Sequence, residues 1–223
     1  MSASGPAARL VVVGAGAASL KSTVALNLAV AAATAGTDTR LRDLDGASSR
    51  ALVRAAGAGA DEGSVALPWA AAPLAVSVGP DAEPEGPETP ALVVVDPPPR
   101  LDDAVRAELA RATVVLVPVD ATPVARRALR EVAAWLATRE APPALRVAMA
   151  RALPRDADRW ALLEEVEALA PGAMLPATLP AGRLASPAGR ERVARLYAPG
   201  TRGAAAYAAL VRALGLTSTR TTP

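Results

Sequence analysis

The sequence contains no cysteine and no histidine. Without cysteine, the chain has neither a disulfide framework nor a thiolate metal site. Without histidine, it is neither a Ser-His-Asp hydrolase nor a histidine-ligated zinc protein, and imidazole acid–base catalysis is excluded. Phenylalanine and isoleucine are absent as well. A hydrophobic core therefore has to be built mainly from valine, leucine and alanine.

Lysine is almost absent too. Of the 24 basic residues, Lys21 is the only lysine, and all the others are arginine. The net charge is +2, a mildly basic balance that permits contact with nucleic acid without demonstrating it. The position of this one lysine is therefore informative.

Long apolar segments are also missing. Residues 1–13 lack the apolar stretch of a signal peptide, and no run of about 18 apolar residues could form a spanning helix. We expect a cytoplasmic protein with no membrane partner.

What the sequence does contain is an alternation of apolar runs and helical segments. At 223 residues, we expect one domain over residues 1–216 and a disordered tail over 217–223. Strands are expected at 9–13, 37–44, 74–78, 91–95, 113–119, 145–150 and 174–179. Helices are expected at 22–35, 48–56, 102–112, 124–138, 156–169, and in two stretches between 188 and 214. This order predicts an α/β fold, a doubly wound and mostly parallel sheet with helices on both faces.

Polar residues follow three of the predicted strands. The stretch GAGAASLKST, residues 14–23, joins the first strand to the first helix, and Lys21-Ser22 stands at its end. Asp43 and Asp45 follow the second strand, and Asp96 ends the apolar run ALVVV. Such positions meet at the carboxyl edge of a parallel sheet. A loop, lysine and hydroxyl of this kind are typical of a phosphate site, with carboxylates placed for Mg²⁺.

Each of these features also has a structural explanation. A Lys-Ser-Thr sequence often caps the start of a helix. Aspartates after strands often form turns. The argument for a phosphate site rests on all of them occurring in the correct order along one α/β pattern.

With these residues in view, the chain resembles the ParA/MinD-type deviant P-loop ATPases, which partition DNA molecules and position other cargo. The resemblance covers most of the chain. It rests on Lys21-Ser22-Thr23 with ALNLAVAAATAG, on Asp43-Leu44-Asp45, on VVVDPPP, on TVVLVPVDATPVARRAL and on LYAPGTRGAAAY. It implies a P-loop NTPase-like fold of the SIMIBI class.

The resemblance also implies a function. ATP and Mg²⁺ would join two subunits into a homodimer that binds nonspecific DNA in association with the nucleoid, and a ParB-like or cargo adaptor protein would trigger hydrolysis. Asp45 would orient the attacking water and Lys21 would contact phosphate, while Thr23 would lie towards the α-phosphate. The implied metal site comprises Ser22, Asp43 and Asp96. The implied nucleotide site comprises Gly14, Gly16, Ser19, Leu20, Lys21, Ser22 and Thr23.

The loop departs from the family pattern. Gly16 stands where the family has the signature lysine that reaches the partner's nucleotide, and Ala17, Ala18 and Leu20 replace glycines. A leucine in the left-handed conformation costs about 1–2 kcal/mol. Ala150 stands where many members have an asparagine that meets adenine. We therefore expect weak nucleotide binding, and hydrolysis that is weak or lost.

The resemblance also suggests a DNA surface. Arginines gather near the end of the chain, where the family's DNA-contacting residues tend to lie, and could follow a phosphate backbone by charge alone. The alternative is a solvated helix face in an arginine-rich protein. The candidate DNA-binding residues are Arg183, Arg190, Arg192, Arg195 and Arg202.

Two other functions remain open from the sequence. The first is a non-catalytic pseudo-ATPase that serves as an adaptor or scaffold. The second is a dinucleotide-binding oxidoreductase, because VVVGAGAAS reads as a Gly-x-Gly-x-x-small fingerprint with Asp43 further along. This second reading leaves Lys21-Ser22 and VVVDPPP unexplained.

Overall fold

Strands and helices alternate along the chain in the computed structural model, which describes residues 8–14, 20–44, 64–65, 70–72, 74–79, 90–120, 122–149, 156–179 and 200–216. The elements in these ranges are β1 (Ala8–Val12), α1 (Lys21–Thr34), β2 (Thr39–Asp43), β3 (Ser64–Val65), β4 (Leu74–Val78), β5 (Leu92–Asp96), α3 (Asp103–Ala110), β6 (Val114–Val119), α4 (Pro123–Ala137), β7 (Ala144–Met149), α5 (Asp156–Leu169), β8 (Met174–Thr178) and α7 (Arg202–Ala213). Seven of the strands and all of these helices were predicted to within about two residues. The predicted helix at 48–56, the first helical stretch after 188 and the tail lie outside the described residues.

All the strands described belong to one sheet with the order β3-β4-β2-β5-β1-β6-β7-β8. Neighbouring strands are parallel except for β3, which pairs antiparallel with β4. The predicted doubly wound, mostly parallel fold is therefore confirmed. The short strand β3 was not predicted, because two residues carry no readable alternation.

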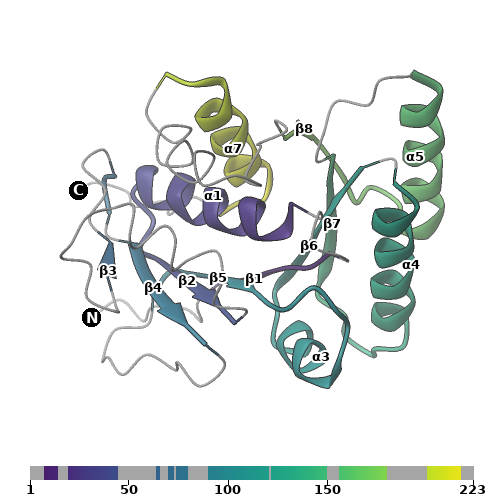
Figure 1. The fold of residues 1–223 in the computed structure, drawn as a ribbon, viewed down its shortest axis with the longest axis horizontal. Helices are drawn as coiled ribbons and strands as arrows, with labels where there is room; N and C mark the ends of the chain where they lie inside the picture. The colour runs from purple at the N-terminus through teal and green to yellow at the C-terminus, as the bar shows by residue number, and fades with distance from the viewer. Residues whose placement is uncertain are drawn as a thin grey trace.

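Helices cover both faces of the sheet (Figure 1). Successive strand residues point to opposite faces, so each central strand contributes to two cores. On one face, Leu10 and Val12 of β1 pack with α1 and α7; we call this the α1-face cluster. On the other, Val11 and Val13 pack with α3, α4 and α5, in the α3-face cluster. Burial on both sides explains why β5 and β6 read as nearly continuous apolar runs.

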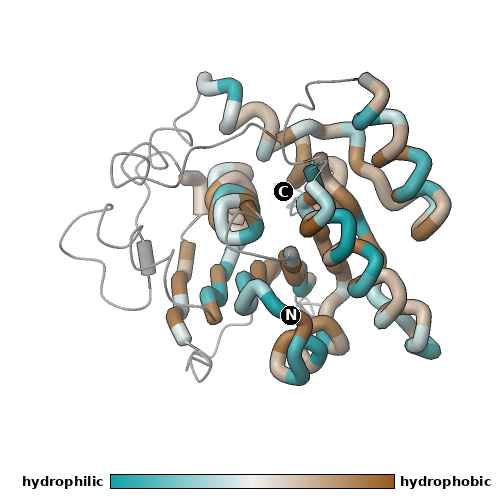
Figure 2. The backbone as a smooth tube through the Cα atoms, turned by 45° about the vertical axis from the view of Figure 1, so that its right-hand side comes forward, coloured by the Kyte–Doolittle hydropathy of each residue, from teal (hydrophilic) through white to brown (hydrophobic). Residues whose placement is uncertain are grey.

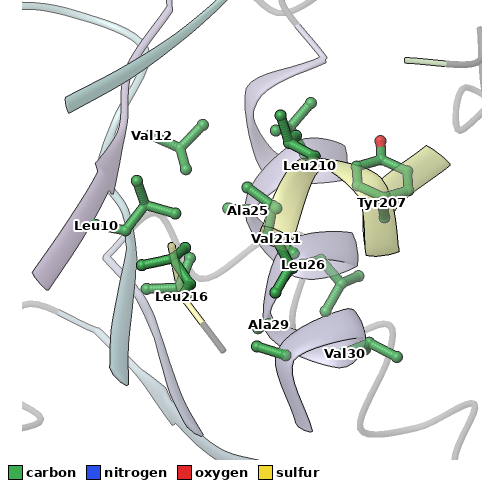
Figure 3. Packing of buried hydrophobic residues seen from close by; sticks show 14 of the residues in the cluster. Leu10, Val12, Ala25, Leu26, Ala29, Val30, Tyr207, Leu210, Val211 and Leu216 are labelled. Carbon is green, nitrogen blue, oxygen red and sulfur yellow. The ribbon is translucent and has the colours of Figure 1, made fainter. Parts of the chain in front are cut away.

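Helix α1 lies between the sheet and α7, and eleven of its fourteen residues are buried. Figure 3 shows Leu210 and Val211 of α7 against Ala25, Leu26 and Ala29 of α1. The many alanines of α1 allow the helix to approach closely both the sheet and α7. The helix ends as predicted at a left-handed glycine: Gly36 has φ 86°, and the N–H groups of Gly36 and Thr37 donate to the carbonyls of Ala33 and Ala32.

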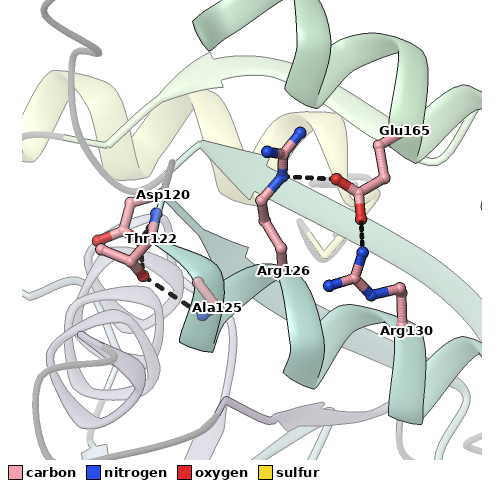
Figure 4. Close-up of polar contacts among 6 residues, drawn as sticks. All are labelled: Asp120, Thr122, Ala125, Arg126, Arg130 and Glu165. Carbon is pink, nitrogen blue, oxygen red and sulfur yellow. Dashed lines mark hydrogen bonds and ion pairs between the residues drawn. The ribbon is translucent and has the colours of Figure 1, made fainter.

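The outer helices are held by polar contacts at their surfaces (Figure 4). Thr122 caps α4, since its hydroxyl accepts a hydrogen bond from the N–H of Ala125 at 3.3 Å. Glu165 of α5 accepts hydrogen bonds from Arg126 (2.5 Å) and Arg130 (2.9 Å) of α4. The two contacts of Glu165 tie α4 to α5.

Hydropathy follows the same layering (Figure 2), with apolar strands inside and mixed helices outside. In the part of the chain described, none of the helices has both the length and the hydropathy that crossing a bilayer requires.

Candidate nucleotide and metal site

The candidate site lies at the carboxyl ends of β1, β5 and β2. Strand β5 is placed between β1 and β2. Asp43 is the last residue of β2 and Asp96 the last of β5, and the two are direct partners in the parallel register. Because α1 begins at Lys21 after the loop from β1, the sheet order brings the lysine to the same edge.

Lys21 is the first residue of α1, and its side chain is only 3% exposed. Its ammonium forms an ion pair with Asp96 Oδ1, and Asp96 is 2% exposed. The ammonium also donates to the hydroxyl of Ser22 at 3.3 Å. Lys21 thus points into the sheet edge and not into solvent.

Asp96 is subject to opposing electrostatic effects. Burial raises the pKa of its carboxyl above the usual range, and this effect is the largest. The charge of Lys21 and hydrogen bonds from Lys21 and Ser22 lower the pKa, while the charge of Asp43 raises it. Asp43, which is fully buried, therefore lies close enough to change the pKa of Asp96. The buried residues Lys21, Asp43 and Asp96, together with the half-buried Ser22, form one polar group, which we call the site cluster.

Leu20, which stands where the family loop has a glycine, precedes α1 in a left-handed conformation. Its φ and ψ are 52° and 3°, in the left-handed region that glycine favours. Its side chain is half-buried and packs against the α1-face cluster. That packing offsets part of the strain of about 1–2 kcal/mol that the backbone imposes on a leucine. The leucine is therefore anchored in the core.

The residues of the site cluster suit Mg²⁺. This ion takes hard oxygen ligands and usually binds one or two carboxylates together with phosphate oxygens and waters. The hydroxyl of Ser22 and the carboxylates of Asp43 and Asp96 provide such oxygens at one place. Within the described residues there is no cluster of three or more metal-binding side chains. A metal here would therefore complete its shell with phosphate and water.

Several predicted site residues lie elsewhere or beyond the described part. Gly14 follows β1 and is half-buried, and it borders a hollow of about 340 Å³ that Pro98, Arg100 and Val124 also line. Thr23 is buried in α1, where its carbonyl accepts a hydrogen bond from Asn27 at 2.7 Å. Arg202, the first residue of α7, is exposed. Gly16, Ser19, Asp45, Ala150, Arg183, Arg190, Arg192 and Arg195 lie outside the described residues.

A second charged group, which is largely buried, was not predicted. On the opposite face of the sheet, Glu108 of α3 pairs with Arg9 of β1 and with Arg42 of β2, the latter at 3.4 Å. We call these three residues the Arg–Glu–Arg cluster. A signal was present in the sequence, since Glu108 lies three residues after the apolar Val105 and therefore on the same face of the helix.

Comparison with known proteins shows that the chain has a known fold. No family model and no curated protein matches the chain. Among solved structures, MinD from Aquifex aeolicus matches with a TM-score of 0.69 at 15% identity, over 97% of this chain and 100% of that one. A putative plasmid partition protein from Borrelia burgdorferi bound to AMPPNP matches at 0.69 and 13%, over 94% and 98%.

A third neighbour is the septum site-determining protein MinD from Pyrococcus horikoshii, complexed with Mg-ADP. It matches with a TM-score of 0.64 at 14% identity, over 93% of this chain and 96% of that one. These neighbours do not favour the two alternatives left open by the sequence. The predicted resemblance is confirmed at the level of the fold, and the chain has the P-loop NTPase-like α/β fold of the MinD and ParA-type partition and positioning ATPases.

Proposed function

We propose that this chain is a ParA-like partition or positioning protein that binds an adenine nucleotide with Mg²⁺ and works as a homodimer on nonspecific DNA. The observation that carries the proposal is the site cluster: the only lysine of the chain is buried beside Ser22 and Asp96 at the sheet edge where this fold binds ligands. Two neighbours of the same fold are complexes with an adenine nucleotide or its analogue: one is complexed with Mg-ADP and the other is bound to AMPPNP.

Each member of the site cluster has a proposed role. Lys21 would hold the β- and γ-phosphates, and Ser22, Asp43 and Asp96 would hold the metal directly or through water. The metal would neutralise phosphate charge. Thr23 would contact the α-phosphate side, and the loop from Gly14 to Leu20 would surround the phosphates.

Hydrolysis is proposed to be weak or lost. Asp45 would orient the attacking water, as part of the positioning on which phosphoryl transfer depends. The signature lysine is replaced by Gly16, which brings no charge to the partner's nucleotide. Less positive charge at the transition state means slower chemistry. A ParB-like or cargo adaptor protein would stimulate the remaining activity.

A nucleotide titration tests the proposal. Millimolar Mg·ATP should stabilise the chain against heat, by about 2.7 kcal/mol if the concentration is 100 times the Kd. Lys21→Ala should abolish the gain, whereas Arg106→Ala, which removes an exposed cation from α3, should retain it. If Mg·ATP produces neither stabilisation nor dimers by light scattering, the proposal is wrong.

Binding to DNA is tested separately, on the dimer, by fluorescence anisotropy with a plain duplex. Affinity should fall steeply between about 50 and 200 mM salt, because phosphate contacts release counterions. A variant with glutamine at five positions should reduce both the affinity and the salt slope; these are Arg183, Arg190, Arg192, Arg195 and Arg202. A control changes the same number of exposed arginines on other helices or loops, namely Arg106, Arg111, Arg127, Arg139 and Arg159. Equal losses in the two variants would indicate that bulk charge, and not a surface, binds DNA.

A further inference from the structure

The ammonium of Lys21 already has an anion. Its ion pair with Asp96 is enclosed on both sides, with exposed fractions of 3% and 2%. One further contact, to Ser22 at 3.3 Å, uses another of its N–H groups. A nucleotide phosphate that engages Lys21 must therefore replace a carboxylate and not water.

Separating this pair without compensation is unfavourable. A carboxylate left alone in a buried site loses its counter-ion and regains little hydration. Asp43 adds to this cost, because its negative charge lies at the end of the next strand and repels the carboxylate of Asp96. With Lys21 at +1 and the two aspartates at −1 each, the site cluster has a formal charge of −1.

A divalent cation resolves this conflict. It would neutralise Asp96 and Asp43 together and change the formal charge of the cluster from −1 to +1. Its preferred ligands are the oxygens that the two aspartates and Ser22 offer. Lys21 would then be released without leaving a buried carboxylate unpaired.

We propose that Asp96 is the internal counter-ion of Lys21, so that the site admits a nucleotide only together with a divalent cation and rejects the free nucleotide. This inference rests on the proposed function, since it concerns regulation of the same site. The site would respond to Mg²⁺ and nucleotide jointly, and the metal-free chain would stay closed to ADP. Removing the charge of Asp96 should turn the metal-dependent site into a general anion site.

Calorimetry with ADP and with pyrophosphate, in Mg²⁺ or in EDTA, tests the proposal. In the natural chain, binding in EDTA should be weaker by about tenfold or more, as expected when a buried pair must be broken. In Asp96→Asn, ADP in EDTA should bind at least about tenfold more tightly than it binds the natural chain, because Lys21 is then free to meet phosphate. Asp103→Asn is the control: it also removes one negative charge, from an exposed position on α3, and keeps the counter-ion, so it should retain the requirement for metal.

The single lysine gives a second readout that needs no variant. Lysine labelled with ¹³C and ¹⁵N should give one side-chain signal from the natural chain, that of Lys21. Free ADP in EDTA should leave this signal in place, and ADP with Mg²⁺ should move it. Movement by ADP in EDTA to the position seen with Mg²⁺ would overturn the proposal even if Asp96→Asn fails to fold.

The outcomes separate this inference from the proposed function. Equal binding of ADP by the natural chain with and without Mg²⁺ overturns the internal counter-ion and leaves the proposed function intact. No binding of Mg·ADP by the natural chain, with capture of ADP by Asp96→Asn, supports the counter-ion and overturns the proposed function. No binding by either chain overturns both.

Discussion

The two buried charged groups of this molecule have opposite compositions. The site cluster, on the α1 face at the end of the strands, places one base between two acids. The Arg–Glu–Arg cluster, on the α3 face, places one acid between two bases. Arg42 and Asp43 are neighbours in β2, so a single strand sends one charge to each face.

The difference indicates which group holds the fold and which can exchange partners. Arginine has a rigid fork of donors, and Glu108 joins α3 to two strands that are separated by β5. Lysine is a point charge on a flexible stem, and it can turn from one anion to another. The Arg–Glu–Arg cluster suits a permanent structural contact, whereas the site cluster suits a contact that a ligand replaces.

The largest effect is expected at the structural contact. Glu108→Ala leaves two arginines without their shared carboxylate, and we expect the free energy of unfolding to fall by about 3 kcal/mol. Urea denaturation measures this loss. Asp103→Ala, at an exposed position on the same helix, should change the free energy by less than about 0.5 kcal/mol. Similar small losses in both variants would contradict a structural role for the cluster.

A smaller loss is expected at the exchangeable contact. Lys21→Met removes the base of the site cluster, but Asp96 can then take up a proton, which limits the loss to about 1–3 kcal/mol. The measurement is urea denaturation at pH 7 in EDTA. If this variant loses as much stability as Glu108→Ala, the distinction between the two clusters fails.

The raised pKa of Asp96 predicts a pH dependence in metal-free buffer. The folded chain takes up this proton at a higher pH than the unfolded chain, whose carboxyl has the ordinary pKa of 3.8. The contribution of Asp96 to stability therefore rises as the pH falls through its folded pKa, and is lost as the pH rises. Between pH 7 and 4, the natural chain should gain stability relative to Asp96→Asn. A relative loss on acidification would mean that the attraction to Lys21 outweighs burial.

The smallest effect is expected next to the site cluster, at Leu20. Leu20→Gly removes a left-handed strain of about 1–2 kcal/mol but also removes a packed side chain, so the two changes should nearly cancel. Leu20→Ala keeps the strain and loses packing, and should be less stable than Leu20→Gly. Thermal denaturation distinguishes them. The reverse order would show that the left-handed backbone imposes no strain on a residue that carries a Cβ atom.

Parts of this structure follow directly from sequence patterns. Strand β5 is a continuous apolar run because both of its faces are buried, and its terminal Asp96 reaches the site by the general rule for parallel sheets. Leu20 stands where the family loop has a glycine, and its backbone has the left-handed conformation that glycine favours. In these places a local pattern and a known motif were sufficient.

Other parts depend on contacts between distant segments. The pairing of Glu108 with Arg9 and Arg42 requires the order β2-β5-β1 and the placement of α3, which no local pattern contains. The direct ion pair of Lys21 with Asp96 does not follow from the loop motif either, because the motif places a phosphate, and not a carboxylate, against the lysine. Buried charges find their partners through topology, and a sequence gives topology only in outline.

The burial of α1 has a consequence for how such a protein can change over generations. A helix enclosed by a sheet on one side and by α7 on the other should have backbone amides among the slowest to exchange with solvent. The lysine at its first turn is therefore held in place by the whole scaffold. Residues of the preceding loop can then be altered without loosening the helix. Substitutions there can therefore weaken ligand binding over time while the fold is kept.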